Sequence, residues 1–465
     1  MPRLWLVILI LALAAGAVLR FANLDASEMS ADEAATWAAA AAPSVTQVIA
    51  LGEQLNPGKV AAHEVVLHWW IAMFGDGIAA LRSLSALFGT LSILLVFWVA
   101  RELLIASPDC GGANGLPDAD ACLAAAIAAL IFAVSLVMLK YSRELRMYSM
   151  MLAVLLAQTG CFIRASRRGG IGNYIGVGAL AGAAVTINFF AILIPAAEAI
   201  WLVYLLLRSG VSPLAAESRR AWAVAIALAI AGAAFAPLML AELHNGGAAV
   251  DRGTLQWIGR PALWEPISLF NKAAGSFVFP ALAVLAAWGA VRGWRVARDA
   301  VAFALVWMWA PVIMMMIASY AFAPVLVERY VLSCFVPFFF LAAIGICELR
   351  NATARGVALA AIVALSLGHI WSYARKPHDV QWREATAIAL KNLAPGATLS
   401  ARPAYAVEVV RYYLPPSERE RAQRGGNPAV VVAEDRSAGA TQHPGLNRDF
   451  PVTIARVRGA VVLKQ

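Results

Sequence analysis

The chain has 465 residues, of which 61% are hydrophobic and only 14% are charged, and its mean hydropathy is +0.72. Soluble domains have roughly half apolar and a quarter charged residues. This composition therefore excludes a soluble domain and indicates a polytopic membrane protein. The formal net charge of +9 comes from small basic clusters between apolar runs, so we expect a positive-inside topology and no nucleic-acid partner.

Apolar runs predict about eleven transmembrane helices, if a span takes about 20 residues and the protein thins the bilayer at shorter ones. In chain order these predicted helices cover residues 4–19, 81–100, 121–139, 149–163, 172–187, 188–207, 221–240, 275–291, 300–320, 331–347 and 356–373. The fifth and sixth are short and nearly fused. The first also resembles a secretory signal peptide with cleavage near Ala17, but we expect it to be retained because the loop charges are then consistent.

The short loops predict the orientation. With the N-terminus in the cytoplasm, the basic residues of the short loops also become cytoplasmic: Arg3, Arg101, Arg164, Arg167, Arg168, Arg208, Arg219, Arg220, Arg292, Arg295, Arg298, Arg350 and Arg355. We therefore expect residues 1–375 to form the transmembrane domain, with an external loop at 20–80. Residues 376–465 are expected to form a small extracytoplasmic α/β domain, with a helix at 382–393 and strands at 429–434 and 452–463.

Polar residues gather at the predicted external surface in four places: Asp32 with Glu33, residues 141–148, the long loop 241–274, and residues 328–330. Carboxylates and arginines at a membrane surface suit an amphiphilic anionic substrate, whose lipid stays in the bilayer while its phosphate meets guanidinium groups. Asp32 and Glu33, just after the first helix, are the best candidates for a catalytic centre.

Structural explanations stay open for these residues. Ser30-x-x-Glu33 is a capping-box pattern, so Glu33 also fits a helix cap, and Asp32 is favourable at the same helix dipole. The charged residues Arg143, Glu144 and Arg146 also fit an interfacial group that pairs internally, and Arg329 fits a snorkelling arginine at a helix end. Four tryptophans favour membrane-interface anchors over sugar-stacking platforms: Trp69, Trp70, Trp257 and Trp264.

Two further features carry weaker signals. Glu198 lies halfway along a predicted helix, where an acid either packs against a polar partner or lines a substrate cavity. His63, Glu64 and His68 have a spacing compatible with metal ligation, but a third partner is missing.

The order of several short motifs resembles the GT-C superfamily of polyprenol-phosphate-dependent glycosyltransferases. The resemblance is to the family 39-like branch, with protein O-mannosyltransferases and aminoarabinose transferases of lipid A. The matching motifs are Arg20-Phe21, Asp32-Glu33, Gly75, Ala80-Leu81-Arg82, Ala100-Arg101-Glu102-Leu103, residues 141–148, Gly178-Ala179-Leu180-Ala181-Gly182, Glu328-Arg329-Tyr330 and residues 379–385. Each motif is short, but their order and spacing extend over most of the chain.

This resemblance implies a GT-C-like membrane fold in a bacterial inner membrane, so that the external loop 20–80 and the tail domain 376–465 are periplasmic. It also implies an inverting transfer of a hexose or pentose from a polyprenyl-phosphate donor to a hydroxyl of a periplasmic lipid, glycan or protein. It implies that Asp32 is the general base, Glu33 its motif partner and Glu144 a second acid near the site. The implied substrate-binding residues are Arg82, Arg143, Arg146, Tyr148, Arg329, Tyr330 and His63. Membrane lipids are the other expected partners. No cofactor or metal site is implied, and a divalent-metal requirement stays open.

The chain departs from the family pattern at two places. Members often carry a Pro-Pro pair where this chain has His63-Glu64-Val65, and a His or Lys is common near the position of Asn188. These differences concern the acceptor pocket and part of the phosphate site. A transporter or flippase of a lipid-linked sugar, a non-catalytic assembly protein, and a transferase with another donor or acceptor stay as alternatives.

Overall fold

The computed structural model describes residues 4–56, 59–106, 115–209, 216–251, 258–375, 380–424, 428–434, 450 and 452–465. The chain divides into two compact units. The first unit comprises Met1–Ala22, Pro57–His63 and Ser83–Ala374, and the second comprises Asn23–Asn56, Glu64–Arg82 and Arg375–Gln465. Most of the loop after the first helix therefore belongs to the same unit as the tail.

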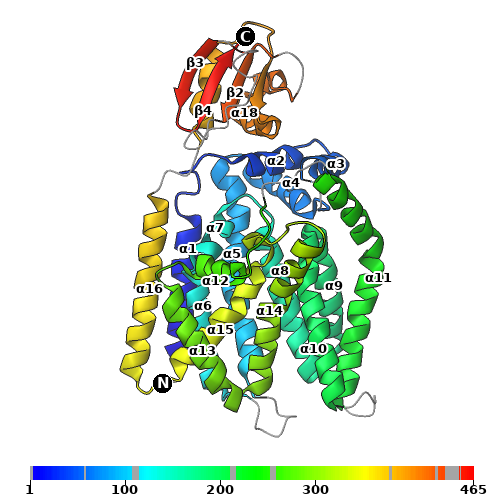
Figure 1. Cartoon of the computed structure of the whole chain (residues 1–465), viewed down its shortest axis with the longest axis vertical. Coiled ribbons are helices and arrows are strands. Elements are labelled where there is room, and N and C mark those ends of the chain that lie inside the picture. The colour runs from blue at the N-terminus through cyan, green and yellow to red at the C-terminus, as the bar shows by residue number, and fades with distance from the viewer. Residues whose placement is uncertain are drawn as a thin grey trace. The chain divides into compact units, whose positions relative to one another are not determined.

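The first unit is helical (Figure 1). Its helices are α1 (Leu4–Phe21), most of α5 (Ile78–Leu104), α6 (Asp118–Ala133), α7 (Leu136–Arg143), α8 (Tyr148–Arg168), α9 (Ile171–Ile187), α10 (Leu193–Ser209), α11 (Ala216–Asp251), α12 (Glu265–Ala274), α13 (Phe279–Val296), α14 (Arg298–Ala321), α15 (Phe335–Cys347) and α16 (Ala352–Ala374).

Within the described ranges, seven helices are long and apolar enough to cross a membrane, or up to nine if each of two bent pairs is one span. The bent pairs are α6 with α7, at 60°, and α12 with α13, at 107°. Two shorter apolar segments, Ile171–Ile187 and Leu332–Cys347, match the other predicted spans. Every predicted apolar segment overlaps a helix, so the predicted class, a polytopic α-helical membrane protein, is confirmed.

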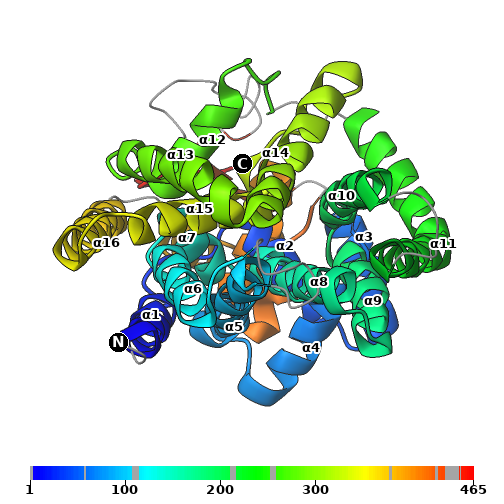
Figure 2. The same cartoon turned by 90° about the horizontal axis from the view of Figure 1, so that it is seen from below.

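Small residues allow close helix packing in this unit. Helix α1 packs against α6, α8 against α9, and α13 against α15 (Figure 2). A Cβ atom added at Gly289 would collide with the carbonyl oxygen of Leu341, and one added at Gly345 would collide with that of Leu285. Such glycines let helix backbones approach closely. In lipid the hydrophobic effect does not drive helices together, so their association depends on this close packing.

The structure corrects one predicted loop and defines one predicted boundary. The long loop expected at 241–274 is partly helical, because α11 continues to Asp251 and α12 occupies Glu265–Ala274. The break between the fifth and sixth predicted spans is at Asn188, whose side chain accepts a hydrogen bond of 2.9 Å from the Phe190 backbone N–H. Trp257 and Asp379 lie outside the described residues.

The second unit combines three helices of the first loop with an α/β tail. Its helices are α2 (Ala31–Ala40), α3 (Val45–Leu55), most of α4 (Ala62–Phe74), α17 (Trp382–Lys391) and α18 (Val407–Tyr413). The sheet has the order β1-β2-β4-β3, from β1 (Leu399–Arg402), β2 (Val430–Glu434), β4 (Ala460–Lys464) and β3 (Val452–Val457). Strands β1 and β2 are parallel, and the other pairs are antiparallel.

The predicted tail elements are present, with one difference. The strand expected over 452–463 is a hairpin of β3 and β4, because the chain turns at Gly459, where φ is 72°. A positive φ costs glycine little and other residues more, so this position favours a turn. Helix α17 packs on β2, β3 and β4.

Two tyrosines of α18 form hydrogen bonds with the loop that follows α1. The Met29 backbone N–H donates to the Tyr413 hydroxyl at 2.8 Å, and the Tyr412 hydroxyl donates to the Asp76 carbonyl at 2.9 Å. The Tyr412 ring also packs edge-on against Trp37 of α2, with ring centroids 4.9 Å apart. Burial, reinforced by the charge of Asp76, raises the pKa of Tyr412 to about 12, so its hydroxyl stays a neutral donor at physiological pH. The tail therefore braces the loop that carries Asp32.

Candidate functional site

Asp32 and Glu33 lie in the first turn of α2. Ser30 is the helix N-cap: its Oγ accepts from the Glu33 N–H at 3.3 Å, and Glu33 Oε2 accepts from the Ser30 N–H at 2.9 Å. The capping-box prediction is confirmed. Glu33 is only 2% exposed, whereas Asp32 is exposed, so only the Asp32 carboxylate is open to solvent or a ligand.

Arg82 binds the buried Glu33 carboxylate. Its Nε donates to Oε1 and its Nη2 to Oε2, both at 2.8 Å, which is the bidentate geometry of a strong ion pair. The same guanidinium donates to the carbonyls of Leu24, Ser27 and Glu28 at 2.8–3.0 Å. All three of its nitrogens donate within the second unit. These contacts favour a role for Arg82 in positioning the loop over a role in direct substrate binding.

The first unit holds a group of four predicted site residues, which we call the arginine–tyrosine cluster: Arg146, Tyr148, Arg329 and Tyr330. The Arg146 guanidinium carbon lies 5.8 Å from the Tyr148 ring centroid. That of Arg329 lies 6.0 Å from the Tyr148 ring and 5.5 Å from the Tyr330 ring. The motif after α7 and the motif before α15 therefore meet, and the rings favour cations at this place.

Acidic and hydroxyl groups border the cluster. Tyr141 packs edge-on against Tyr148, with centroids 5.3 Å apart. Its hydroxyl donates to Glu328 Oε1 at 2.7 Å, and the Lys140 ammonium lies 3.5 Å from the same oxygen. The Glu328 carboxylate is thus bound by the Tyr141 hydroxyl and the Lys140 ammonium. Its negative charge is balanced without Arg329.

Two residues beside the cluster carry no functional signal in the sequence. Phe190 stacks on Tyr330 with ring centroids 4.1 Å apart. Lys59 is only 2% exposed, and its Nζ lies 4.0 Å from Met147 Sδ, next to Arg146 in the chain. A lysine is rarely buried unless it is paired. The sequence around Lys59 is polar, so it does not predict that this side chain is buried.

Arg143 and Glu144 lie at the end of α7. Arg143 Nη1 donates to the carbonyls of Leu19 and Ala22, each at 2.7 Å, at the C-terminal end of α1. A cation there satisfies open carbonyls and the helix dipole. Glu144 is half-buried at the C-cap of α7, and its carbonyl accepts from the Arg146 N–H at 2.7 Å.

His63 and Glu64 are buried at the start of α4, with exposed fractions of 1% and 0%. His68 Nδ1 lies 2.9 Å from the Ala40 carbonyl oxygen. Among the described residues, no three His, Cys, Asp or Glu side chains gather as metal ligands do.

Glu198 of α10 is buried against a polar partner, as one of the two interpretations predicted. The Gln158 amide of α8 donates to Glu198 Oε2 at 2.6 Å, and Glu198 is only 1% exposed. This pair lies within the helix bundle, away from the residues of the arginine–tyrosine cluster in sequence and in helix position.

An apolar groove of about 580 Å³ runs along α9, α10 and α11. Ile192 lines it and belongs to the same short 3-10 helix, Phe189–Ile192, as the cluster neighbour Phe190. The other lining residues are apolar or glycine: Ala181, Gly182, Val185, Pro195, Ala196, Ala199, Leu202, Val203, Leu206, Trp222, Ala225, Leu228, Ala229, Ala231, Gly232, Phe235 and Met239.

No protein-family model and no curated protein sequence matches the chain. Solved structures match it over its length. Apo ArnT from Cupriavidus metallidurans has 14% identity and a TM-score of 0.62, covering 98% of this chain and 97% of that one. ArnT bound to undecaprenyl phosphate has 14% identity and a TM-score of 0.63, covering 100% and 98%. The chain has the GT-C fold.

A more distant GT-C structure supports the same conclusion. The Archaeoglobus fulgidus oligosaccharyltransferase, in complex with Zn and sulfate, has 14% identity and a TM-score of 0.58, covering 92% of this chain and 68% of that one. At this identity the likeness establishes the GT-C fold, and the roles of individual residues rest on the contacts described above. The GT-C fold agrees with the resemblance noted in the sequence.

Proposed function

We propose that this GT-C protein is an inverting glycosyltransferase that moves a sugar from a polyprenyl-phosphate donor to a hydroxyl acceptor. The observation that carries the proposal is the arginine–tyrosine cluster. A sugar phosphodiester has one negative charge, and Arg146 and Arg329 offer two guanidinium groups for it. ArnT of the same fold was solved with undecaprenyl phosphate.

The lipid part of the donor has a candidate place. A polyprenyl chain is apolar and long, so it requires an apolar channel that begins beside the phosphate site. The groove along α9, α10 and α11 is lined by apolar residues, and one of them, Ile192, belongs to the same short helix as Phe190, which stacks on Tyr330 of the cluster. We place the prenyl chain in this groove.

Asp32 is the proposed general base. A hydroxyl is too weak an acid to ionise beforehand, so the base takes its proton as the new carbon–oxygen bond forms. The acceptor oxygen bonds to the anomeric carbon while the bond from that carbon to the phosphate oxygen breaks, which inverts the centre. The proton ends on Asp32, and the polyprenyl phosphate leaves with one more negative charge, which Arg146 and Arg329 stabilise.

The remaining predicted residues take supporting roles in this proposal. Tyr148 and Tyr330 hold the two guanidinium groups in place, and Lys59 is a third cation near the phosphate. Glu33 and Arg82 fix the helix that presents Asp32. Glu144 stays a candidate second acid and His63 a candidate substrate contact.

We further propose that the protein lies in the bacterial inner membrane, with the N-terminus in the cytoplasm and residues 376–465 in the periplasm. The support is the distribution of arginines, which gather in the loops at one end of the helices. The donor sugar would then be used on the periplasmic side.

Mass spectrometry of cells with and without the gene tests this function. We expect loss of the gene to leave one polyprenyl-phosphate sugar in excess in the lipid extract and to remove the same sugar from one surface molecule. A transporter would give a different result in a second assay, because purified protein would never cleave the sugar–phosphate bond. An unchanged lipid extract and unchanged surface glycans would contradict the proposal.

A further inference from the structure

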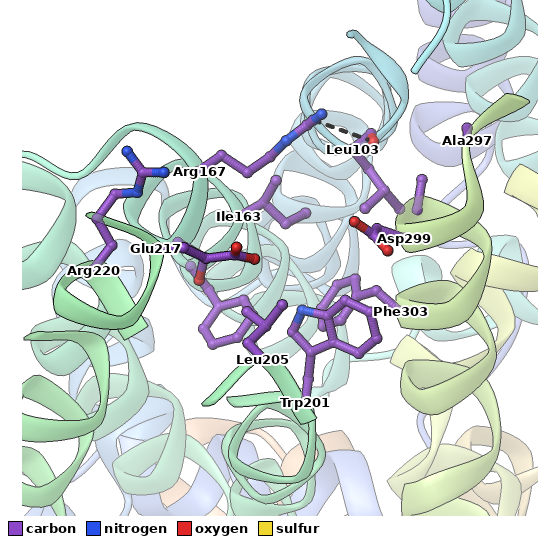
Figure 3. A pocket seen from close by; sticks show the side chains of 13 residues that line it. Leu103, Ile163, Arg167, Trp201, Leu205, Glu217, Arg220, Ala297, Asp299 and Phe303 are labelled. Atoms are coloured by element: carbon purple, nitrogen blue, oxygen red, sulfur yellow. Dashed lines mark hydrogen bonds between the residues drawn. The ribbon is translucent and has the colours of Figure 1, made fainter. Parts of the chain in front are cut away.

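A second pocket lies at the other end of the helix bundle (Figure 3). It has a volume of about 80 Å³, which is room for several water-sized groups. Its walls come from α5, α8, α10, α11 and α14, and its lining residues include Arg167, Trp201, Glu217, Arg220, Asp299 and Phe303.

Helix α8 fixes the position of this pocket. Tyr148, at the start of α8, belongs to the arginine–tyrosine cluster, whereas Ile163 and Arg167, near its end, line the pocket. At 1.5 Å per residue these two places are about 25 Å apart along the helix, close to the thickness of the hydrocarbon core. The pocket therefore lies at the opposite membrane face and takes no part in the proposed transfer.

The pocket contains charges of both signs. Arg167 and Arg220 line it from α8 and α11, and the Arg167 guanidinium donates to the carbonyls of Glu102, Leu103 and Ile105 at the end of α5. The Glu217 and Asp299 carboxylates point into it from two sides (Figure 3). Asp299 Oδ1 is bound by Arg208 at 2.6 Å. No described side chain forms a salt bridge with the half-buried Glu217.

The floor of the pocket is apolar. Trp201 and Leu205 of α10 and Phe303 of α14 lie below the charged groups (Figure 3). A charged rim above an apolar floor, at the end of membrane-spanning helices, suits an amphiphile better than a water-soluble ion.

We propose that this pocket binds the headgroup of a zwitterionic aminophospholipid of the ethanolamine type. Its phosphate would meet Arg220, and its ammonium group would donate to Glu217. A headgroup without a cation leaves the Glu217 carboxylate facing a phosphate, which is repulsive. A choline headgroup has a cation but no N–H to donate, so it cannot satisfy a carboxylate by hydrogen bonding. On the proposed topology this lipid belongs to the cytoplasmic leaflet.

Native mass spectrometry of the full chain in detergent tests this proposal, with phosphatidylethanolamine, phosphatidylcholine and phosphatidylglycerol of equal chain length as probes. We expect one phosphatidylethanolamine to bind about tenfold more tightly than either of the others. Glu217→Gln should abolish the preference over phosphatidylglycerol, and Arg220→Gln should weaken all three. Arg219→Gln, at an exposed neighbouring position of α11, is the matched control and should leave binding unchanged.

Three results would overturn the inference. The first is equal binding of the three lipids by the unchanged protein. The second is a Glu217→Gln variant that keeps the preference, provided that its thermal unfolding matches the Arg219→Gln control. The third is displacement of the lipid by soluble phosphoethanolamine alone. That result would show that the pocket binds a free phosphoester and not a membrane lipid.

Discussion

Asp32 and Glu33 are neighbours in the chain, but their carboxylates have different surroundings. Glu33 is buried, closes the N-terminus of α2 and forms a bidentate pair with Arg82. Asp32 is exposed in the same helical turn. Because a base must reach a proton on the acceptor, the exposed Asp32 fits that role, and the buried Glu33 fits the role of holding the helix in place.

Glu33→Gln tests the structural role. The substitution leaves the buried Arg82 without its counter-charge, which should cost about 3–5 kcal/mol of stability. We expect a clear fall in the unfolding temperature of the purified protein, whereas Asp32→Asn should unfold at the temperature of the unchanged protein. A double variant with Arg82→Gln should recover part of the loss, because no unpaired charge then remains buried. Equal unfolding of Glu33→Gln and the unchanged protein would refute the role.

Arg329→Ala tests donor binding at the arginine–tyrosine cluster. Removing one guanidinium group that meets the donor phosphate should raise the KM for the polyprenyl-phosphate sugar by about tenfold or more and also lower kcat. The acceptor KM should stay unchanged. Arg143→Ala is a useful comparison, because Arg143 contacts carbonyls of α1 and should affect stability more than donor KM. Unaltered donor kinetics in Arg329→Ala would count against the assignment.

The residues differ in how far the sequence could predict their roles. The capping box of Ser30 and Glu33 is a local pattern, and the sequence predicted it correctly. The contacts of Arg143 with α1, of Glu198 with Gln158 and of Phe190 with Tyr330 join segments distant in the chain. Only tertiary packing decides such contacts, so neither a motif nor a periodicity identifies them.

At the scale of elements, length and hydropathy predicted the helices, whereas local geometry decided their bends and ends. The predicted span 121–139 is bent by 60° between α6 and α7, and the predicted loop 241–274 contains α12. Apolar composition sets where a helix is stable in a bilayer, but it does not report a break at membrane depth. The strand predicted at 452–463 is similarly divided by the turn at Gly459.

The groove along α9, α10 and α11 gives a prediction for α11. Ala225→Phe places a larger side chain in the groove, so we expect a severalfold higher KM for a long-chain polyprenyl donor. A donor with a single prenyl unit should be used as well as by the unchanged protein, because its chain ends before the filled part. Ala227→Phe, on the same helix but not among the groove-lining residues, is the comparison. Equal loss with both donors would indicate a folding defect and not a blocked groove.

The contact of α18 with the first loop gives another prediction. Tyr413→Phe removes the hydroxyl that accepts the Met29 N–H, at a cost of about 0.5–1.5 kcal/mol. The loop that carries Asp32 should then be held less firmly, so we expect kcat to fall severalfold while the donor KM stays constant. Tyr405→Phe, an exposed tail residue, should change neither. A rise in donor KM without a change in kcat would contradict a bracing role for the tail.

At the scale of the whole molecule, the GT-C fold was predictable from the order of short motifs, although each motif alone is weak. The composition gave the membrane class, and the resemblance gave the arrangement that solved structures then matched. The sequence did not indicate that the first loop and the tail form one unit. That association depends on contacts such as those of Tyr412 and Tyr413, which have no pattern in the sequence.

The central claim is that Asp32 is the base of a transfer from a polyprenyl-phosphate sugar, and its direct test is turnover by purified protein. A donor with a labelled sugar is incubated with the purified protein and an extract of surface glycans and lipids, and the released polyprenyl phosphate is measured. We expect Asp32→Asn to reduce the release at least a hundredfold, since a general base contributes about 10²–10⁴, with unfolding and donor binding unchanged. Turnover by Asp32→Asn close to that of the unchanged protein would contradict the claim.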